Sequence, residues 1–391
     1  MRRLHIVFAI AMLLSFVGFG CQSGKQRKEA YAHWNSARGG VQGSLAAERY
    51  KLGNLDDARK AADEAIKLDP TNASYRVLSA RIHIERNQLE AADQELATAR
   101  KLAPTNGEPD YLSGIVYQRW QKPQLALDYY AIACEKSPAE LQYLMARVEM
   151  LVQLKRNEDA ISLLEGKMTF FEYSGPLRDM LGGLYQQRGE LPKATEMYLQ
   201  ATILSPDDPL IREHLAMAYF KANNYRDCMD QIDRLLKLED YQKRADLYML
   251  KGECHLQRDQ LREARAALET SLEQNPSSVP ALLTMSKVAI RTNDLDRAEL
   301  SLRKAMSLEG NQPQVFLGMG YLRMKQQRWD DALAAFEKAS KLDPKDAIAV
   351  CMSGLVLEKK GNPDEAMRYY GRALQINPNE ELAKTLLSKA K

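Results

Sequence analysis

The sequence predicts an all-α protein, a right-handed α-solenoid (superhelix) of about ten helix-turn-helix repeats. The first observation is a period of 34 residues. Prolines recur at multiples of this period, apart from one interval that is two residues longer, at Pro70, Pro104, Pro138, Pro206, Pro276, Pro344 and Pro378. The second observation is a small residue twelve positions before each expected proline, at Ala58, Ala92, Ala126, Ala160, Ala194, Cys228, Ala264, Ala298, Ala332 and Ala366. A fixed period of this length is typical of stacked helical repeats, which bury their apolar faces against one another.

Each period carries the signals of a second helix and of the turn before it. Acidic residues gather at the start of this helix, as in Asp56-Asp57 and Asp364-Glu365, and lysine at its end, as in Lys341. Both placements complement the helix macrodipole, so we interpret these carboxylates as helix starts rather than as acid–base catalysts. The turn holds residue types that tolerate a left-handed backbone, at Gly53, Asn87, Gly189, Asn223, Asn293 and Gly361.

Small residues also recur in the first helix of each period, where two antiparallel helices need short side chains to approach closely. They lie at Ala46, Ala80, Gly114, Gly182, Ala216, Gly252, Gly320 and Gly354, and bulky residues such as Tyr130, Tyr198, Phe336 and Tyr370 fill the space beside them. The pattern resembles the tetratricopeptide repeat, with one of the clearest copies at Leu181-Gly182, Tyr185, Gly189, Ala194, Tyr198, Ala201 and Pro206. The resemblance implies ten repeats within 39–380, at 39–72, 73–106, 107–140, 141–174, 175–208, 209–244, 245–278, 279–312, 313–346 and 347–380, followed by a capping helix at 381–391.

The N-terminus has the features of an export signal. Arg2 and Arg3 precede an apolar run from Ile6 to Phe19, which is shorter than the roughly 20 residues that a membrane-spanning helix needs. Cys21 follows directly, and this arrangement resembles a bacterial lipoprotein signal. The resemblance implies a signal peptide at 1–20, a lipid such as palmitate on Cys21, and a polar tether and N-terminal cap at 21–38. Because Gln22 follows Cys21, the resemblance also favours the outer membrane, facing the periplasm, over the inner membrane. An ordinary cleavage site with an incidental cysteine is the alternative.

The composition is that of a globular protein, and its overall charge is too small to attract nucleic acid or a membrane surface. Charged residues make up 27% of the chain and hydrophobic residues 45%. The net charge is +3, or +1 once Arg2 and Arg3 are removed with the signal. We therefore expect no nucleic-acid partner and no membrane contact through bulk charge.

No motif of catalysis or of cofactor binding is present. The five histidines lack metal-ligand spacing, and there is no phosphate loop or nucleophile elbow. We expect no enzyme activity, no metal, no cofactor and no small-molecule substrate. Cys134, Cys228, Cys254 and Cys351 fall on helical positions. A bridge between Cys228 and Cys254 is conceivable in an oxidising compartment, but burial without a bond is the favoured interpretation.

A second apolar stripe in the first helices predicts a binding groove. In one repeat Leu317, Tyr321 and Met324 recur at helical spacing. The tetratricopeptide resemblance implies that such positions face a concave groove, here formed by Tyr111, Met145, Met217, Phe220, Met249, Leu256, Leu283, Ile290, Leu317, Tyr321 and Met324. Arg291, Lys325 and Lys359, spaced 34 apart, would add positive charge at the groove's edge. Packing between repeats is the alternative explanation of the stripe.

These features predict a non-enzymatic scaffold or adaptor that is anchored by lipid in the bacterial cell envelope. Its expected partner is a peptide or helix of an envelope protein, with some acidic character, lying along repeats six to ten. The chain resembles repeat lipoproteins that assist envelope assembly, such as pilotins of type IV pilus secretins, so a pilus or secretion system is one expected setting. The alternative is an auxiliary subunit of an enzyme for cell-wall or polysaccharide synthesis or export.

Overall fold

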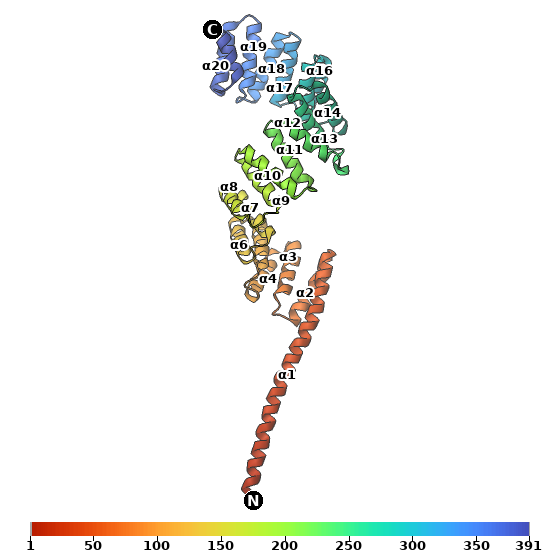
Figure 1. The fold of residues 1–391 in the computed structure, drawn as a ribbon, viewed down its shortest axis with the longest axis vertical. Coiled ribbons are helices and arrows are strands. Elements are labelled where there is room, and N and C mark those ends of the chain that lie inside the picture. The colour runs from red at the N-terminus through yellow and green to blue at the C-terminus, as the bar shows by residue number, and fades with distance from the viewer. Residues whose placement is uncertain (1, 391) are drawn as a thin grey trace. The chain divides into compact units, whose positions relative to one another are not determined.

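The computed structural model describes the backbone of residues 2–390 and the side chains of residues 24–389, and every regular element in this range is helical. The helices run in order along the chain (Figure 1). Their bounds are α1 (Arg2–Lys51), α2 (Leu55–Leu68), α3 (Ala73–Glu85), α4 (Leu89–Leu102), α5 (Glu108–Arg119), α6 (Pro123–Lys136), α7 (Leu141–Gln153), α8 (Asn157–Lys167), α9 (Gly175–Gln187), α10 (Leu191–Leu204), α11 (Pro209–Lys221), α12 (Tyr225–Leu235), a 3₁₀ turn η1 (Glu239–Tyr241), α13 (Ala245–Gln257), α14 (Leu261–Gln274), α15 (Val279–Arg291), α16 (Leu295–Leu308), α17 (Pro313–Lys325), α18 (Trp329–Leu342), α19 (Ala347–Lys359), α20 (Pro363–Ile376) and α21 (Glu381–Ala390).

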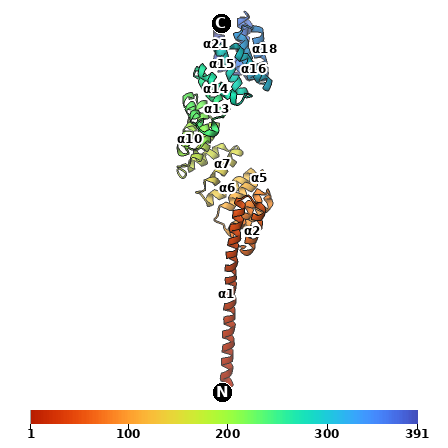
Figure 2. The same cartoon turned by 90° about the vertical axis from the view of Figure 1, so that its right-hand side faces the viewer.

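These helices form ten pairs in the predicted register, from α1 with α2 to α19 with α20, so the expected repeat architecture is confirmed. The chain divides into two compact units, one ending at Glu172 and one starting at Tyr173. Figure 2 shows the helices of each unit from a second direction. The division falls just after α8, a shorter helix that ends one residue beyond Gly166. The second unit contains repeats five to ten.

Close contact within each pair explains the glycines of the first helices. A Cβ atom on Gly320 would lie 2.4 Å from Cε1 of Phe336, and one on Gly114 would lie 2.3 Å from Cε1 of Tyr130. The aromatic ring of the second helix therefore occupies the volume that a side chain on the first helix would need. This close approach is what the recurring small and bulky residues predicted.

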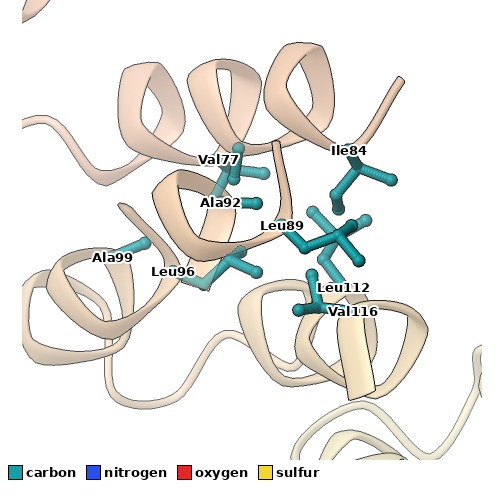
Figure 3. Close-up of a cluster of buried hydrophobic side chains, with 9 residues drawn as sticks. Val77, Ile84, Leu89, Ala92, Leu96, Ala99, Leu112 and Val116 are labelled. Carbon is teal, nitrogen blue, oxygen red and sulfur yellow. The ribbon is translucent and has the colours of Figure 1, made fainter. Parts of the chain in front are cut away.

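Contacts between successive repeats recur at equivalent positions. In several repeats the alanine near the start of the second helix shares a buried cluster with an aliphatic residue of the following repeat. Figure 3 shows one such cluster, in which Ala92 and Leu96 of α4 lie with Val116 of α5. The same pairing of slots occurs for Ala58 with Ile82, Ala264 with Val288, Ala298 with Leu322, and Ala332 with Val356.

Ala332 should not accept a large aliphatic side chain. Ala332 is fully buried between Phe336, Met352 and Val356. Ala332→Leu is expected to lower the free energy of unfolding by roughly 1–3 kcal/mol, because extra methylene groups in a filled core force side chains and backbone apart. Amide hydrogen exchange should quicken in α17 to α20, since neighbouring repeats stabilise one another. Unchanged exchange in these four helices would contradict the register.

The two ends of the chain differ from each other. At the C-terminus, Ala383 of α21 is buried in a cluster with Tyr370 and Ala373, and Leu386 and Leu387 pack against it, as a capping helix should. At the N-terminus, α1 runs unbroken through Gly39, Gly40 and Gly43. Over residues 24–38 the side chains are nearly all exposed, and Ser36 Oγ donates a hydrogen bond to Oδ2 of Asp69, at the end of α2, at 3.0 Å.

Two expectations about the N-terminus fall outside this description. The side chains of the signal segment and of Cys21, the expected lipid site, lie before the first described side chain. Within the described part of the chain, no helix combines the length and the apolar character that crossing a membrane requires.

Candidate partner-binding groove

The first helices of repeats seven, eight and nine enclose a pocket of about 430 Å³ in the second unit. Leu256 comes from α13, Leu283 and Ile290 from α15, and Leu317 and Tyr321 from α17. These three helices are neighbours because the stacking of repeats places each first helix beside the next. We call this pocket the groove. Its remaining lining residues are Gln257, Ser286, Lys287, Arg291, Gln314 and Gly318.

The apolar side of the groove packs on the buried core beneath it. Leu256 and Ile290 are largely buried, and Ser286 Oγ donates to the backbone carbonyl of Leu283 at 2.7 Å. The ring of Tyr321 meets Phe336 edge-on, with 5.4 Å between ring centroids. Burial raises the pKa of Tyr321 to about 12, so its phenol stays neutral at physiological pH. The groove therefore offers a preformed apolar surface.

Positive charge lies at one edge of the groove. Lys287 is exposed on α15, one helical turn before Arg291. Arg291 Nη2 donates to Asp259 Oδ1 at 2.6 Å and its Nη1 donates to the Leu256 carbonyl at 3.3 Å. Because this pairing offsets much of the charge of Arg291, Lys287 is the cation best placed to attract an anionic group of a ligand. Gln257 and Gln314 add exposed hydrogen-bonding groups.

Six of the fourteen residues expected to line a groove surround this pocket: Leu256, Leu283, Ile290, Arg291, Leu317 and Tyr321. Others are used in packing. Phe220 packs against the buried cluster of Cys228 and Ile232, Met249 against that of Leu268, and Met324 against that of Phe336. Met217, Lys325 and Lys359 are exposed.

Two expected groove residues lie in the first unit. Tyr111 of α5 stacks on Tyr143 with ring centroids 4.6 Å apart, and its hydroxyl accepts a hydrogen bond from Gln142 Nε2 at 2.7 Å. Met145 is half-buried on α7. Neither residue lines the pocket, and both belong to a different unit from the groove.

Sequence reasoning missed polar residues that line the groove. Lys287 stands 34 residues before Tyr321, and Gln257 stands 34 residues before Arg291, so both occupy slots that had been selected in a neighbouring repeat. Applying each slot to every repeat would have found both residues.

Within residues 24–389, no three His, Cys, Asp or Glu side chains gather in a way that could hold a metal ion. His83 Nδ1 lies 2.8 Å from Gln88 Oε1, and His255 Nδ1 lies 3.0 Å from Gln260 Oε1. These two pairs repeat one local contact between a first helix and its turn, which agrees with a packing role for both histidines.

Comparison with protein families finds the same repeat. Two family models, both described as tetratricopeptide repeat, match the chain, one at residues 214–279 and 317–381 and the other at 49–113 and 255–320. Together they cover more than half of the sequence, including the three helices of the groove.

Individual relatives are more distant. Cellulose synthase operon protein C of Pseudomonas fluorescens (strain SBW25) is 27% identical over 220 residues, which are 55% of this chain but only 15% of that protein. A tetratricopeptide repeat protein from Parabacteroides merdae has a similar solved structure, with a TM-score of 0.51 and 17% identity, over 73% of this chain and 98% of that one. Yeast Tom70 matches with a TM-score of 0.48 and 15% identity, over 93% of this chain and 88% of that one.

Proposed function

Since the chain belongs to the tetratricopeptide repeat family, we propose that it is a non-enzymatic scaffold that binds a segment of a partner protein in the groove of α13, α15 and α17. Repeats of this kind stack helices into extended concave surfaces, and function then depends on the side chains that line them. The observation that carries the proposal is the pocket itself, where Leu283, Leu317 and Tyr321 come together from separate helices.

The lining of the groove indicates the chemistry of the partner. Aliphatic and aromatic side chains form its floor, so a bound segment should bury apolar side chains there, as peptides and amphipathic helices do in apolar grooves. Lys287 at the edge favours an acidic residue on the same segment. We therefore propose a short apolar and acidic segment as the ligand.

We further propose that the protein acts in the bacterial cell envelope, where a lipid on Cys21 anchors it to the outer membrane. The exposed part of α1 supports this arrangement. Residues 24–38 make few contacts with the repeats. A helix of that length extends about 22 Å at 1.5 Å per residue, enough to hold the repeats away from a bilayer surface. Assembly of an envelope complex such as a pilus or secretion system is the proposed setting.

A second candidate function is an auxiliary role in making or exporting a polysaccharide. The observation that favours it is the similarity to cellulose synthase operon protein C. In this role the groove would hold a segment of a synthase or export component. The two candidates share the groove and differ in the partner, so identifying the bound protein decides between them.

Charge reversal at the edge of the groove tests the proposed site. Lys287→Glu is expected to weaken partner binding about tenfold, because it places a carboxylate opposite the acidic residue of the ligand. Lys304→Glu on α16 is the matched control, since Lys304 is also exposed but lines a different pocket. Chemical crosslinking in the native cell, with the partner quantified by mass spectrometry, measures the effect. Equal recovery with both variants would rule out the groove.

A further inference from the structure

Two cysteines meet at the junction between repeats six and seven. Cys228 is on α12 and Cys254 is on α13, and both side chains are fully buried. Their sulfur atoms lie 3.5 Å apart. A disulfide bond is about 2.05 Å long, so the two sulfurs need to approach by only about 1.5 Å to be joined.

The sequence register makes this meeting unusual. Cys228 occupies the slot that holds alanine in the nine other repeats, and Cys254 occupies the slot that holds Val288, Leu322 and Val356 in later repeats. These two slots share a buried cluster at other junctions, where the pair is an alanine with an aliphatic residue. At the junction of repeats six and seven alone among these, both members of the contacting pair are cysteine.

This junction also departs from the regular repeat. Repeat six is two residues longer than the period, α12 is only 11 residues long, and η1 (Glu239–Tyr241) precedes α13. The backbone connection between α12 and α13 is therefore longer than that at most other junctions between repeats. A covalent bond between the two helices would add a restraint across it. Because α13 contributes Leu256 to the groove, the bond would also fix one wall of the binding site.

We propose that Cys228 and Cys254 form a disulfide that joins α12 to α13. The oxidant is a second disulfide, either of low molecular weight or in a thiol–disulfide oxidoreductase. The thiolate of one cysteine attacks a donor sulfur, the donor disulfide breaks, and the first donor thiolate leaves. The other cysteine thiolate then attacks the protein sulfur of the mixed disulfide and displaces the second donor thiolate. The two cysteine protons and two electrons end on the two donor thiols.

The bond should form while the chain folds. Both sulfurs are buried in the folded protein. The hydrogen bond with Cys254 is the main cause that raises the pKa of the Cys228 thiol, and burial raises this pKa further. Few thiolates are therefore available for exchange once α13 has packed. The same burial protects the finished disulfide from reductants. This inference concerns the junction and stands independently of the ligand proposed for the groove.

Peptide mapping tests the proposal. The full-length chain is unfolded, refolded with reduced and oxidised glutathione, alkylated without reduction and digested with trypsin. We expect the peptides of residues 227–234 and 252–258 to appear as one linked species, which separates on reduction, whereas Cys134 and Cys351 are alkylated. Alkylation of both Cys228 and Cys254 after refolding with excess oxidised glutathione would overturn the proposal.

A thermal comparison checks the same bond without proteolysis. The Tm of the oxidised wild-type protein should fall when the protein is reduced while unfolded and is then refolded with reductant present. Cys228→Ala should fold, because nine other repeats carry alanine at this slot, and its Tm should not respond to reductant. Cys351→Ala is the matched control, since it removes another buried cysteine and should keep the response. A response that persists in Cys228→Ala would overturn the proposal.

Discussion

Phe336→Ala is expected to lower the free energy of unfolding of the second unit by about 3–5 kcal/mol, the range found when a buried phenylalanine is removed from a core. The Phe336 side chain is fully buried. Its ring contacts Tyr321 at 5.4 Å between centroids and lies where a side chain on Gly320 would be, so its loss leaves a cavity between α17 and α18. Because Tyr321 rests on this ring, the groove should also lose its shape. Denaturant unfolding followed by circular dichroism measures the change.

Phe170→Ala is the control for this experiment. The Phe170 side chain is 56% exposed, so its removal leaves no closed cavity and should change stability little. Repeat arrays do not always unfold in one step. Hydrogen exchange should therefore accompany the denaturant curves, and the loss of protection should centre on α17 and α18. Similar effects of the two substitutions would contradict the packing described for repeat nine.

Cys21→Ala is expected to abolish acyl labelling of the protein and to release it from the membrane fraction. Acyl chains bind a bilayer through buried methylene groups at about 0.8 kcal/mol each, so stable anchoring depends on them. The measurement is incorporation of a clickable palmitate analogue in the native cell, followed by membrane fractionation.

The matched control for this substitution is Cys134→Ala. Cys134 is a half-buried thiol on α6, far along the sequence from the expected lipid site. This variant should keep both its acyl label and its membrane association. Undiminished acyl labelling of Cys21→Ala would show that the lipid is attached elsewhere, and would remove the basis for the proposed anchor.

The repeat register could be derived from sequence because it depends on side-chain size, which the sequence states directly. Alanine, glycine and large aromatic residues recur where helices cross, and the ten helix pairs follow from them. The left-handed position in the turn between the two helices of each repeat was only partly predicted. Gly53 and Asn87 were identified as left-handed, and both are, but Gln121, Lys155, Asp259 and Gln327 occupy the same slot with φ near +60°. For these side chains the geometry of the repeat overrides the local preference.

The N-terminus shows why a glycine is ambiguous in a sequence. Glycine commonly interrupts a helix, yet α1 continues through Gly39, Gly40 and Gly43. A Cβ atom on Gly43 would lie 2.5 Å from Cε1 of Tyr75, so this glycine permits a close helix contact rather than a break. The sequence does not distinguish these two uses, because the partner ring is 32 positions away and belongs to the next repeat.

The groove was predicted where one slot holds apolar residues in successive repeats. Leu283 and Leu317 share such a slot, and both line the pocket. Phe220 and Met324 were predicted on the same grounds at another position of the repeat, but their side chains pack against neighbouring helices. A slot fixes the direction of a side chain approximately, whereas exposure depends on the volumes of the residues around it. Those volumes are set by packing in three dimensions.

Site-specific photocrosslinking in the native cell tests most directly whether the groove binds a partner. A photoreactive residue replaces Gln314, which is exposed and lines the groove, or Leu300, which is exposed on α16 and lines a different pocket. We expect one protein to be attached at position 314, through an apolar and acidic segment, and this attachment to be lost when Lys287→Glu is added. No attachment at 314, or the same protein attached equally at 300, would contradict this expectation.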